Sequence, residues 1–236
     1  MELIFLDTET TGIDFSKDRL CQVCYRTSKG TKMEYFKPSQ PMSVKAMSVT
    51  HITNKMLADK PPFIGSPMHR ELEALLAAGG VLVAHNAKFD CAMLAAEGLS
   101  VPQSICTLRV ARFLDSKGII PEYNLQFLRY YLDLEVSGSA HDAEGDVNVL
   151  HAVFQRLLAK VREQIPDEQA ALQKMIEVSS APSLLGRFNF GKYKDKTVEE
   201  VSRIDKGYLT WLLNQKLSSD DKDEDWIHTL QHHLSA

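Results

Sequence analysis

The stretch that decides the fold lies at the start of the chain and reads Leu3-Ile4-Phe5-Leu6-Asp7-Thr8-Glu9-Thr10-Thr11-Gly12. Its apolar beginning predicts a buried strand that ends at a glycine turn. Successive side chains of a strand point to opposite faces, so Asp7 and Glu9 share one face. Two carboxylates on one face repel each other unless a cation lies between them, and hard cations such as Mg²⁺ prefer carboxylate oxygen. The stretch alone leaves two interpretations open: a metal site, or an Asx turn in which Asp7 bonds the backbone near Thr8.

The composition is that of an ordinary globular protein. The chain has 236 residues, 44% hydrophobic and 25% charged, which suits one full α/β domain with a small appendage. It contains no apolar run of ~20 residues and no secretion signal, so we expect a cytoplasmic protein without membrane association. The net charge of −4 does not indicate nucleic-acid binding, although a local basic surface is enough to hold a phosphate backbone.

The four cysteines are too few and too scattered for a disulfide scaffold. Cys21 and Cys24 have the spacing of half a zinc site, but they lie in an expected strand, where positions three apart face opposite sides. No second Cys/His pair follows at finger spacing. We therefore interpret these two residues as structural cysteines.

Hydrophobic periodicity predicts strands that alternate with helices. Expected strands follow the opening one at 19–27, 31–37, 81–84 and 104–106, and the first three form an antiparallel meander because their connections are short. Expected helices cover 43–47, 53–57, 67–78, 108–114, 125–132, 167–178 and 226–234. Another helix follows the loop 85–90 and ends near residue 97, and a long amphipathic helix follows the segment 139–146.

Two further carboxylates occupy functional positions in this pattern. Asp90 ends the run His85-Asn86-Ala87-Lys88-Phe89-Asp90, which follows the strand 81–84 at its carboxyl end, where open α/β sheets bind ligands. Asp146 lies one turn before Leu150 on or beside the apolar face of the long helix, where a carboxylate is unfavourable unless something pairs with it. His141 lies just upstream. These residues are a second indication of a carboxylate cluster.

Together these motifs resemble the DEDDh class of the DnaQ-like 3′→5′ exonuclease superfamily. The first motif matches residues 5–12, the second matches 85–90, and the third, H-x4-D, matches His141-Asp142-Ala143-Glu144-Gly145-Asp146. The sibling class has a tyrosine four residues before the last aspartate, where this chain has Asp142. The resemblance implies an α/β fold with an RNase H-like mixed sheet flanked by helices, the DnaQ-like exonuclease fold, plus a small C-terminal module.

Further matches extend the likeness nearly end to end, to the bacterial exodeoxyribonuclease X family. They are Val49-Thr50-His51-Ile52-Thr53, Ile105-Cys106-Thr107-Leu108, Phe190-Gly191-Lys192-Tyr193-Lys194 and Tyr208-Leu209-Thr210-Trp211-Leu212. One departure is Gln22, where many relatives have an acidic residue, but this position lies outside the metal set. We expect an exonuclease domain over residues 1–162, a helical linker over 163–182 and the small module over 183–236.

By this resemblance, two Mg²⁺ ions, for which Mn²⁺ can substitute, bind to four carboxylates. Asp7 bridges both ions, Glu9 and Asp146 complete the site of the ion that activates water, and Asp90 holds the second ion. His141 is the implied general base, because its ordinary pKa lies near working pH. The residues expected to contact the terminal nucleotide are Thr10, Thr11, Gly12, His51, His85, Asn86 and Phe89, with a core position as the alternative for Phe89.

Within the C-terminal module, residues 183–216 contain seven Lys/Arg against four Asp/Glu. We expect its aromatic side chains to form a small core: Phe188, Phe190, Tyr193, Tyr208 and Trp211. The alternative is that an aromatic side chain stacks on a base while basic side chains hold phosphates. Nucleic acid and a protein partner both remain open as ligands of the module.

The sequence therefore predicts a metal-dependent 3′→5′ exonuclease that acts on DNA ends, single-stranded or also duplex, and functions in repair or degradation. RNA 3′-end trimming and polymerase proofreading are alternatives within the same chemistry, because no residue here reads the 2′-OH unambiguously. An alternative of another class is a non-catalytic module that binds nucleic acid or a partner. The complete set of four acids with His141 argues against that alternative.

Overall fold

A computed structural model describes residues 1–136, 143–219 and 222–235. The chain forms two compact units: the first combines Met1–Thr107 with Asn124–Leu158, and the second combines Leu108–Tyr123 with Ala159–Ala236. These units are defined by compactness alone, so the domain boundaries expected after residues 162 and 182 stay predictions. No helix in the described ranges is long and apolar enough to cross a bilayer.

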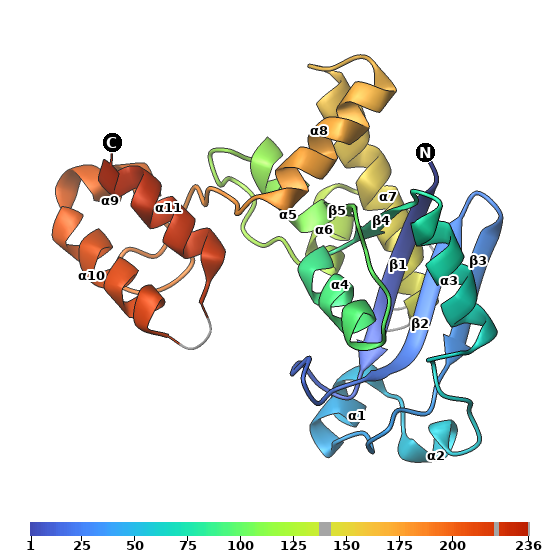
Figure 1. The fold of residues 1–236 in the computed structure, drawn as a ribbon. Coiled ribbons are helices and arrows are strands. Elements are labelled where there is room, and N and C mark those ends of the chain that lie inside the picture. The colour runs from blue at the N-terminus through green and yellow to red at the C-terminus, as the bar shows by residue number, and fades with distance from the viewer. Residues whose placement is uncertain (137–142, 220–221, 236) are drawn as a thin grey trace. The chain divides into compact units, whose positions relative to one another are not determined.

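A five-stranded mixed sheet forms the centre of the first unit (Figure 1). Its strands are β1 (Leu3–Thr10), β2 (Leu20–Thr27), β3 (Gly30–Tyr35), β4 (Val81–Ala84) and β5 (Ser104–Cys106), in the order β3-β2-β1-β4-β5. The first three pair antiparallel, whereas β4 and β5 run parallel to β1. This confirms the predicted mixed sheet and its opening meander.

Helices cover the sheet and connect its strands. In the first unit they are α1 (Val44–Thr50), α2 (Asn54–Leu57), α3 (Pro67–Ala77), α4 (Ala87–Ala96), α6 (Leu125–Tyr131) and most of α7 (Ala143–Arg162). Pro67 opens α3 as expected, with the Ser66 hydroxyl capping it. The α1 helix extends three residues beyond the predicted end, to Thr50, because His51 adopts a left-handed conformation (φ 58°) and donates its backbone N–H to Met47.

The two faces of β1 contact different helices. Ile4 and Leu6 belong to a core cluster that includes Met93 and Leu94 of α4. Phe5 points the other way and packs edge-on against Phe154 of α7, with ring centroids 5.1 Å apart. Because a strand alternates with period two, the odd positions of β1 face α7 and the even positions face the core that α4 covers. The pairing of β1 with β2 shifts between Glu9 and Thr10, so an irregularity interrupts the ladder just before its last pair, Thr10 with Leu20.

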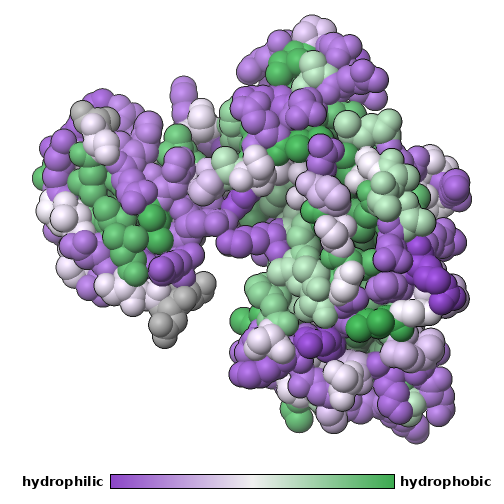
Figure 2. Space-filling model, viewed as in Figure 1, coloured by the Kyte–Doolittle hydropathy of each residue, from purple (hydrophilic) through white to green (hydrophobic). Residues whose placement is uncertain are grey.

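The second unit contains α8 (Glu168–Ser180), α9 (Val198–Ile204), α10 (Lys206–Ser218) and α11 (Glu224–Ser235), and α5 (Thr107–Leu114) enters it from β5. The last three helices surround an aromatic core in which Phe188 stacks on Trp226, with ring centroids 4.8 Å apart. Figure 2 shows a band of hydrophobic residues framed by hydrophilic ones on the visible face of these three helices.

The aromatic side chains of this module do not all lie in its core. Phe188 and Tyr193 are buried, and Phe190 and Tyr208 pack partly buried against them, as predicted. The prediction was wrong for Trp211, which is 54% exposed. Leu209 and Leu212 form the buried side of α10, and the 3.6-residue helical period places residue 211 away from that side.

Candidate active site

The strand β1 presents Asp7 and Glu9 toward α7. Both residues share a face with Phe5, which contacts Phe154 of that helix. Both side chains are half-buried at the end of the strand. This confirms the orientation predicted from the i, i+2 spacing. The Asx-turn alternative for Asp7 is not supported, because residue 7 lies within the regular β1–β2 pairing opposite Cys24.

Asp90 reaches the same place from α4. The chain turns directly from β4 into this helix through Asn86, whose left-handed conformation (φ 67°) asparagine tolerates better than most residues. Asp90 then lies buried in the first turn of α4, where the helix dipole favours a carboxylate. The buried hydroxyl of Thr8 donates to its Oδ1 over 2.8 Å. Thr8 therefore ties Asp90 to the strand that carries Asp7 and Glu9.

Asp146 lies in the first turn of α7, on the side of β1 that the odd positions face. The Nε2 of Gln126, on α6, donates to its Oδ1 over 2.6 Å. The Nη1 of Arg129 lies 3.5 Å from the Oε1 of the same glutamine. Because a guanidinium can only donate, this contact directs the amide oxygen toward Arg129 and the amide nitrogen toward Asp146. Gln126 thus orients the fourth carboxylate.

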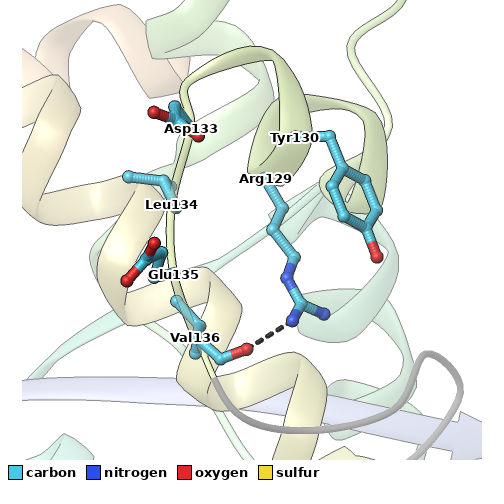
Figure 3. A pocket seen from close by; sticks show the side chains of 6 residues that line it. All are labelled: Arg129, Tyr130, Asp133, Leu134, Glu135 and Val136. Atoms are coloured by element: carbon cyan, nitrogen blue, oxygen red, sulfur yellow. Dashed lines mark hydrogen bonds between the residues drawn. The ribbon is translucent and has the colours of Figure 1, made fainter.

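Arg129 also binds the chain that follows α6. Its Nη2 donates to the carbonyl of Val136, and its guanidinium lies 5.3 Å from the centroid of the Tyr130 ring. Figure 3 shows the bond to Val136 across a pocket lined by Arg129, Tyr130, Asp133, Leu134, Glu135 and Val136. Val136 is the last described residue before the segment that contains His141. The α6 helix therefore contacts both Asp146 and the chain that leads toward His141.

The four carboxylates influence one another electrostatically. Burial, followed by the charges of Asp90, Glu9 and Asp146, raises the pKa of Asp7 well above its usual range. Burial and the charges of Asp146 and Asp90 raise the pKa of Glu9 to about 7. Burial also raises the pKa of Asp90 to about 7, although the hydrogen bond from Thr8 lowers it. The structure thus brings all four predicted acids into one electrostatic cluster.

The chemistry of this donor set fits divalent cations. Carboxylate oxygens are the ligands that Mg²⁺ and Mn²⁺ prefer, and the cation would relieve the repulsion that raises the pKa of Asp7. Within the described ranges, no three His, Cys, Asp and Glu side chains are already arranged to hold a metal ion. Two of the four acids instead accept hydrogen bonds from neutral side chains, Asp90 from Thr8 and Asp146 from Gln126.

The threonines and glycine after Glu9 form a tight, hydrogen-bonded turn. The hydroxyl of Thr10 donates to the carbonyl of Gly12 over 2.6 Å, and that of Thr11 donates to Asp18 Oδ1 over 2.8 Å. A Cβ at Gly12 would lie only 2.4 Å from Asp18 Oδ2. The missing side chain at residue 12 therefore makes room for Asp18. The sequence alone did not predict this role of Gly12. The expected contacts of these three residues with a nucleotide stay predictions.

The remaining predicted substrate residues lie on loops and helix ends. His85 follows β4 half-buried, with its Nδ1 2.9 Å from the hydroxyl of Thr107. Asn86 is exposed, and Phe89 is partly buried against the core with its ring 5.7 Å from that of Phe15. His51 is exposed at the end of α1. His141 lies outside the described residues, so its predicted role as general base stays a prediction.

Two supporting residues were missed by sequence reasoning. Thr8 lies inside the first motif, and its position between two carboxylates on the opposite face of the strand was a usable signal. Gln126 had no such signal. It lies 20 residues before Asp146, and only the packing of α6 near α7, which follows no local sequence period, brings the two side chains together. Gln22, the departure noted on β2, is buried and its Nε2 lies 3.2 Å from the sulfur of Met33.

Comparisons with known proteins identify relatives of both parts of the chain. The model of the exonuclease family matches residues 4–154, and the model described as exodeoxyribonuclease X-like C-terminal matches residues 188–216. Exodeoxyribonuclease 10 of Escherichia coli is 28% identical over 98% of this chain and 98% of its own length. The DNA polymerase III epsilon subunit of Treponema pallidum is 32% identical, covering 67% of this chain and 77% of the relative.

Solved structures show the same fold. Exonuclease X in complex with 5′ overhanging duplex DNA matches with a TM-score of 0.56 and 24% identity, over 75% of this chain and 99% of the other. The zinc-bound complex of E. coli ExoI with single-stranded DNA matches with a TM-score of 0.58 and 20% identity, over 73% of this chain and 43% of the other. Both likenesses confirm the predicted DnaQ-like architecture.

Proposed function

This chain belongs to the exonuclease family, and from that premise we propose that it removes nucleotides from the 3′ ends of DNA. The reaction is hydrolysis of the terminal phosphodiester, which releases nucleoside 5′-monophosphates. The observation that carries the proposal is the cluster of Asp7, Glu9, Asp90 and Asp146 at the end of β1, in which burial and the neighbouring carboxylates raise the pKa of Asp7 and of Glu9. The similarity to exodeoxyribonuclease 10 over nearly the whole chain supports DNA as the substrate.

Different residues of the chain have different roles in this reaction. Asp7, Glu9, Asp90 and Asp146 would hold two Mg²⁺ ions, and Mn²⁺ suits the same oxygen donors. When bound, such ions lower the pKa of the attacking water and stabilise the charge on the leaving 3′ oxygen. His141 takes the proton from that water. Thr8 and Gln126 orient Asp90 and Asp146 through their hydrogen bonds.

The nucleotide-binding surface surrounds this cluster. We assign contacts with the terminal nucleotide to the turn at Thr10–Gly12, because its backbone directly follows Glu9, and to His85, Asn86 and Phe89, which join β4 to Asp90 on α4. His51, at the end of α1, completes the proposed set. We propose repair or degradation of DNA in the cytoplasm as the setting of this activity.

Proofreading within a polymerase assembly is the second candidate, because the epsilon subunit of T. pallidum is 32% identical to this chain. That likeness covers 67% of the chain, whereas the likeness to exodeoxyribonuclease 10 covers 98% and includes the C-terminal module. A separate match of the exodeoxyribonuclease X-like C-terminal model to residues 188–216 points the same way. The independent exodeoxyribonuclease is therefore favoured.

The test is degradation of 5′-labelled oligonucleotides by the purified protein. Matched DNA and RNA strands are incubated with Mg²⁺, with Mn²⁺ and with EDTA, using the wild type and Asp7→Asn. We expect a ladder of shortened DNA that requires metal and is lost in the variant. A ladder on RNA alone would move the protein to RNA 3′-end trimming. Absence of degradation on both strands would leave the non-catalytic binding module as the better interpretation.

A further inference from the structure

The α10 helix exposes an aromatic side chain on a face suited to bases. Trp211 is 54% exposed, whereas Trp226, the other tryptophan, is 5% exposed. Residues one turn before and after Trp211 share its face of the helix, and these are Gly207, Tyr208, Asn214 and Gln215. None of the four carries a charge, and the two amides can donate and accept hydrogen bonds. A Cβ at Gly207 would meet only Asp205, at 3.5 Å, so the helix surface is open there.

The exposed indole rests on a column of aromatic rings. Its centroid lies 5.5 Å from that of Tyr208, which packs edge-on against Tyr193 at 4.9 Å. The Tyr193 hydroxyl donates to Asp205 over 2.6 Å, which ties the column to the start of α10. Tyr208 is further confined by Gly191, where any Cβ would lie 2.9 Å from the tyrosine hydroxyl. Trp211 therefore packs against Tyr208 although 54% of its surface is exposed.

The segment that carries this column has more basic than acidic residues, although the chain as a whole is acidic. The chain as a whole carries −4, whereas residues 183–216 contain seven Lys/Arg and four Asp/Glu. Lys192 lies 4.8 Å from the Tyr193 ring and 3.2 Å from Asp205. Lys194 and Lys206 are exposed and form no ion pair among the described residues. The ammonium groups of Lys194 and Lys206 are therefore available to attract a phosphate backbone.

We infer that this face of α10, with the 190–194 loop, binds single-stranded DNA by stacking a base on Trp211 while Lys192, Lys194 and Lys206 attract the phosphates. The inference deepens the proposed function, because the strand bound here is the substrate of the exonuclease domain. Base–aromatic stacking tolerates any sequence, since every base has a flat π-face. The module therefore supplies affinity without sequence preference, as an exonuclease that passes along a strand requires.

The experiment measures binding separately from cleavage. The full-length Asp7→Asn protein in Mg²⁺ serves as the background, and the affinity for a labelled oligothymidylate is measured by fluorescence anisotropy. Trp211→Ala, Trp211→Phe and the control Ile204→Ala are added to this background. Ile204 is a matched control because it is an apolar residue of the same module and is 63% exposed. Thermal unfolding of each variant verifies that the module remains folded.

We expect Trp211→Ala to lower the affinity by roughly tenfold or more, and Trp211→Phe to keep most of it. Ile204→Ala should bind like the background protein. Titration with the oligothymidylate should also quench the emission of the exposed Trp211, and this quenching should vanish in Trp211→Phe. Lys194→Ala and Lys206→Ala should each reduce the dependence of affinity on salt.

Equal affinity of Trp211→Ala and Ile204→Ala would overturn the inference and would leave the face to a protein partner. This failure is distinguishable from failure of the proposed function. If the wild type degrades DNA while Trp211→Ala binds normally, only the present inference fails. If the wild type degrades no DNA while Trp211→Ala loses affinity, the site stands and the exonuclease proposal fails.

Discussion

Asp7 and Asp205 are aspartates in the two compact units of the same chain, and their surroundings act on them in opposite ways. Burial and three neighbouring carboxylates raise the pKa of Asp7 well above its usual range. The pKa of Asp205 falls to about 2, because it accepts hydrogen bonds from the Tyr193 hydroxyl and the backbone N–H of Tyr208 and lies beside Lys192. Asp7 therefore lies among like charges, whereas Asp205 lies among hydrogen-bond donors and a lysine.

The difference distinguishes a carboxylate proposed to serve catalysis, Asp7, from one that stabilises the fold of its module, Asp205. The partners of Asp205 are supplied by its own module, so its charge contributes to folding. The partners of Asp7 within the described structure are other carboxylates, so its charge is unfavourable until a cation arrives. Electrostatic repulsion of this kind is typical of sites that serve binding or catalysis. Substitutions that neutralise either aspartate should therefore have opposite effects on activity and stability.

The largest effect is expected from Asp7→Asn. The loss of one of the four carboxylates that would hold the ions should lower exonuclease activity by roughly a thousandfold or more. In EDTA the same change should leave Tm unchanged or raise it, because it removes a charge from a repelling cluster. Initial rates on a labelled DNA strand and thermal unfolding measure the two effects. A clear fall in Tm without metal would show that Asp7 supports the fold in the way Asp205 does.

A smaller effect is expected from Gln126→Leu. The variant loses the hydrogen bond to Asp146 Oδ1, so the carboxylate is no longer oriented, and Mn²⁺ affinity should fall roughly 10- to 100-fold. Calorimetric titration of Mn²⁺ without DNA measures this directly. Gln169→Leu is the control, because Gln169 is exposed on α8. Unchanged or tighter Mn²⁺ binding in Gln126→Leu would contradict an orienting role.

The third prediction concerns pH. In the folded protein the pKa values of Glu9 and Asp90 lie at about 7, against ordinary values of 4.5 and 3.8. Between these values the folded state holds protons that the unfolded state has released, so raising the pH favours unfolding. In EDTA, the free energy of unfolding should fall by roughly 1–3 kcal/mol from about pH 5 to about pH 7.

Urea unfolding across this range measures the slope, and saturating Mg²⁺ should flatten it because the cation stabilises the ionised carboxylates. Glu9→Gln should reduce the slope by removing one of the titrating groups. The contribution of Asp205 has the opposite sign, since its pKa is lowered and its stabilisation is lost only as the pH falls below about 4. A metal-free protein that gains stability from pH 5 to 7 would refute the assignment of the cluster.

The smallest effect is expected from Asp205→Asn. Asparagine still caps α10, but the variant loses the charge that pairs with Lys192 and accepts from Tyr193. We expect a fall in Tm of at most about 4 °C and an unchanged rate on short DNA. Hydrogen exchange of α10 locates the loss. A large loss of activity would mean that Asp205 belongs to the catalytic part of the protein.

Much of the fold and site was predictable because it depends on local periods. The alternation of β1 gave the shared face of Asp7 and Glu9, and the short apolar run at β4 placed Asp90 at a strand end. The contact between Gln126 and Asp146 was not predictable, because only tertiary packing brings α6 to the start of α7. Trp211 was misplaced because its aromatic character was given more weight than its position on α10.

The alternation of the side chains of β1 limits which sequence changes this protein can tolerate during evolution. Its odd positions carry Asp7 and Glu9, while its even positions carry the core residues Ile4 and Leu6 and then Thr8, which binds Asp90. Deleting one residue before Asp7 would exchange the two faces, so that both acids would enter the core while Leu6 and Thr8 would replace them. Fold and site would be lost in a single event. This strand can therefore diverge by substitution but not by length, and insertions compatible with activity are confined to the connections beyond Gly12.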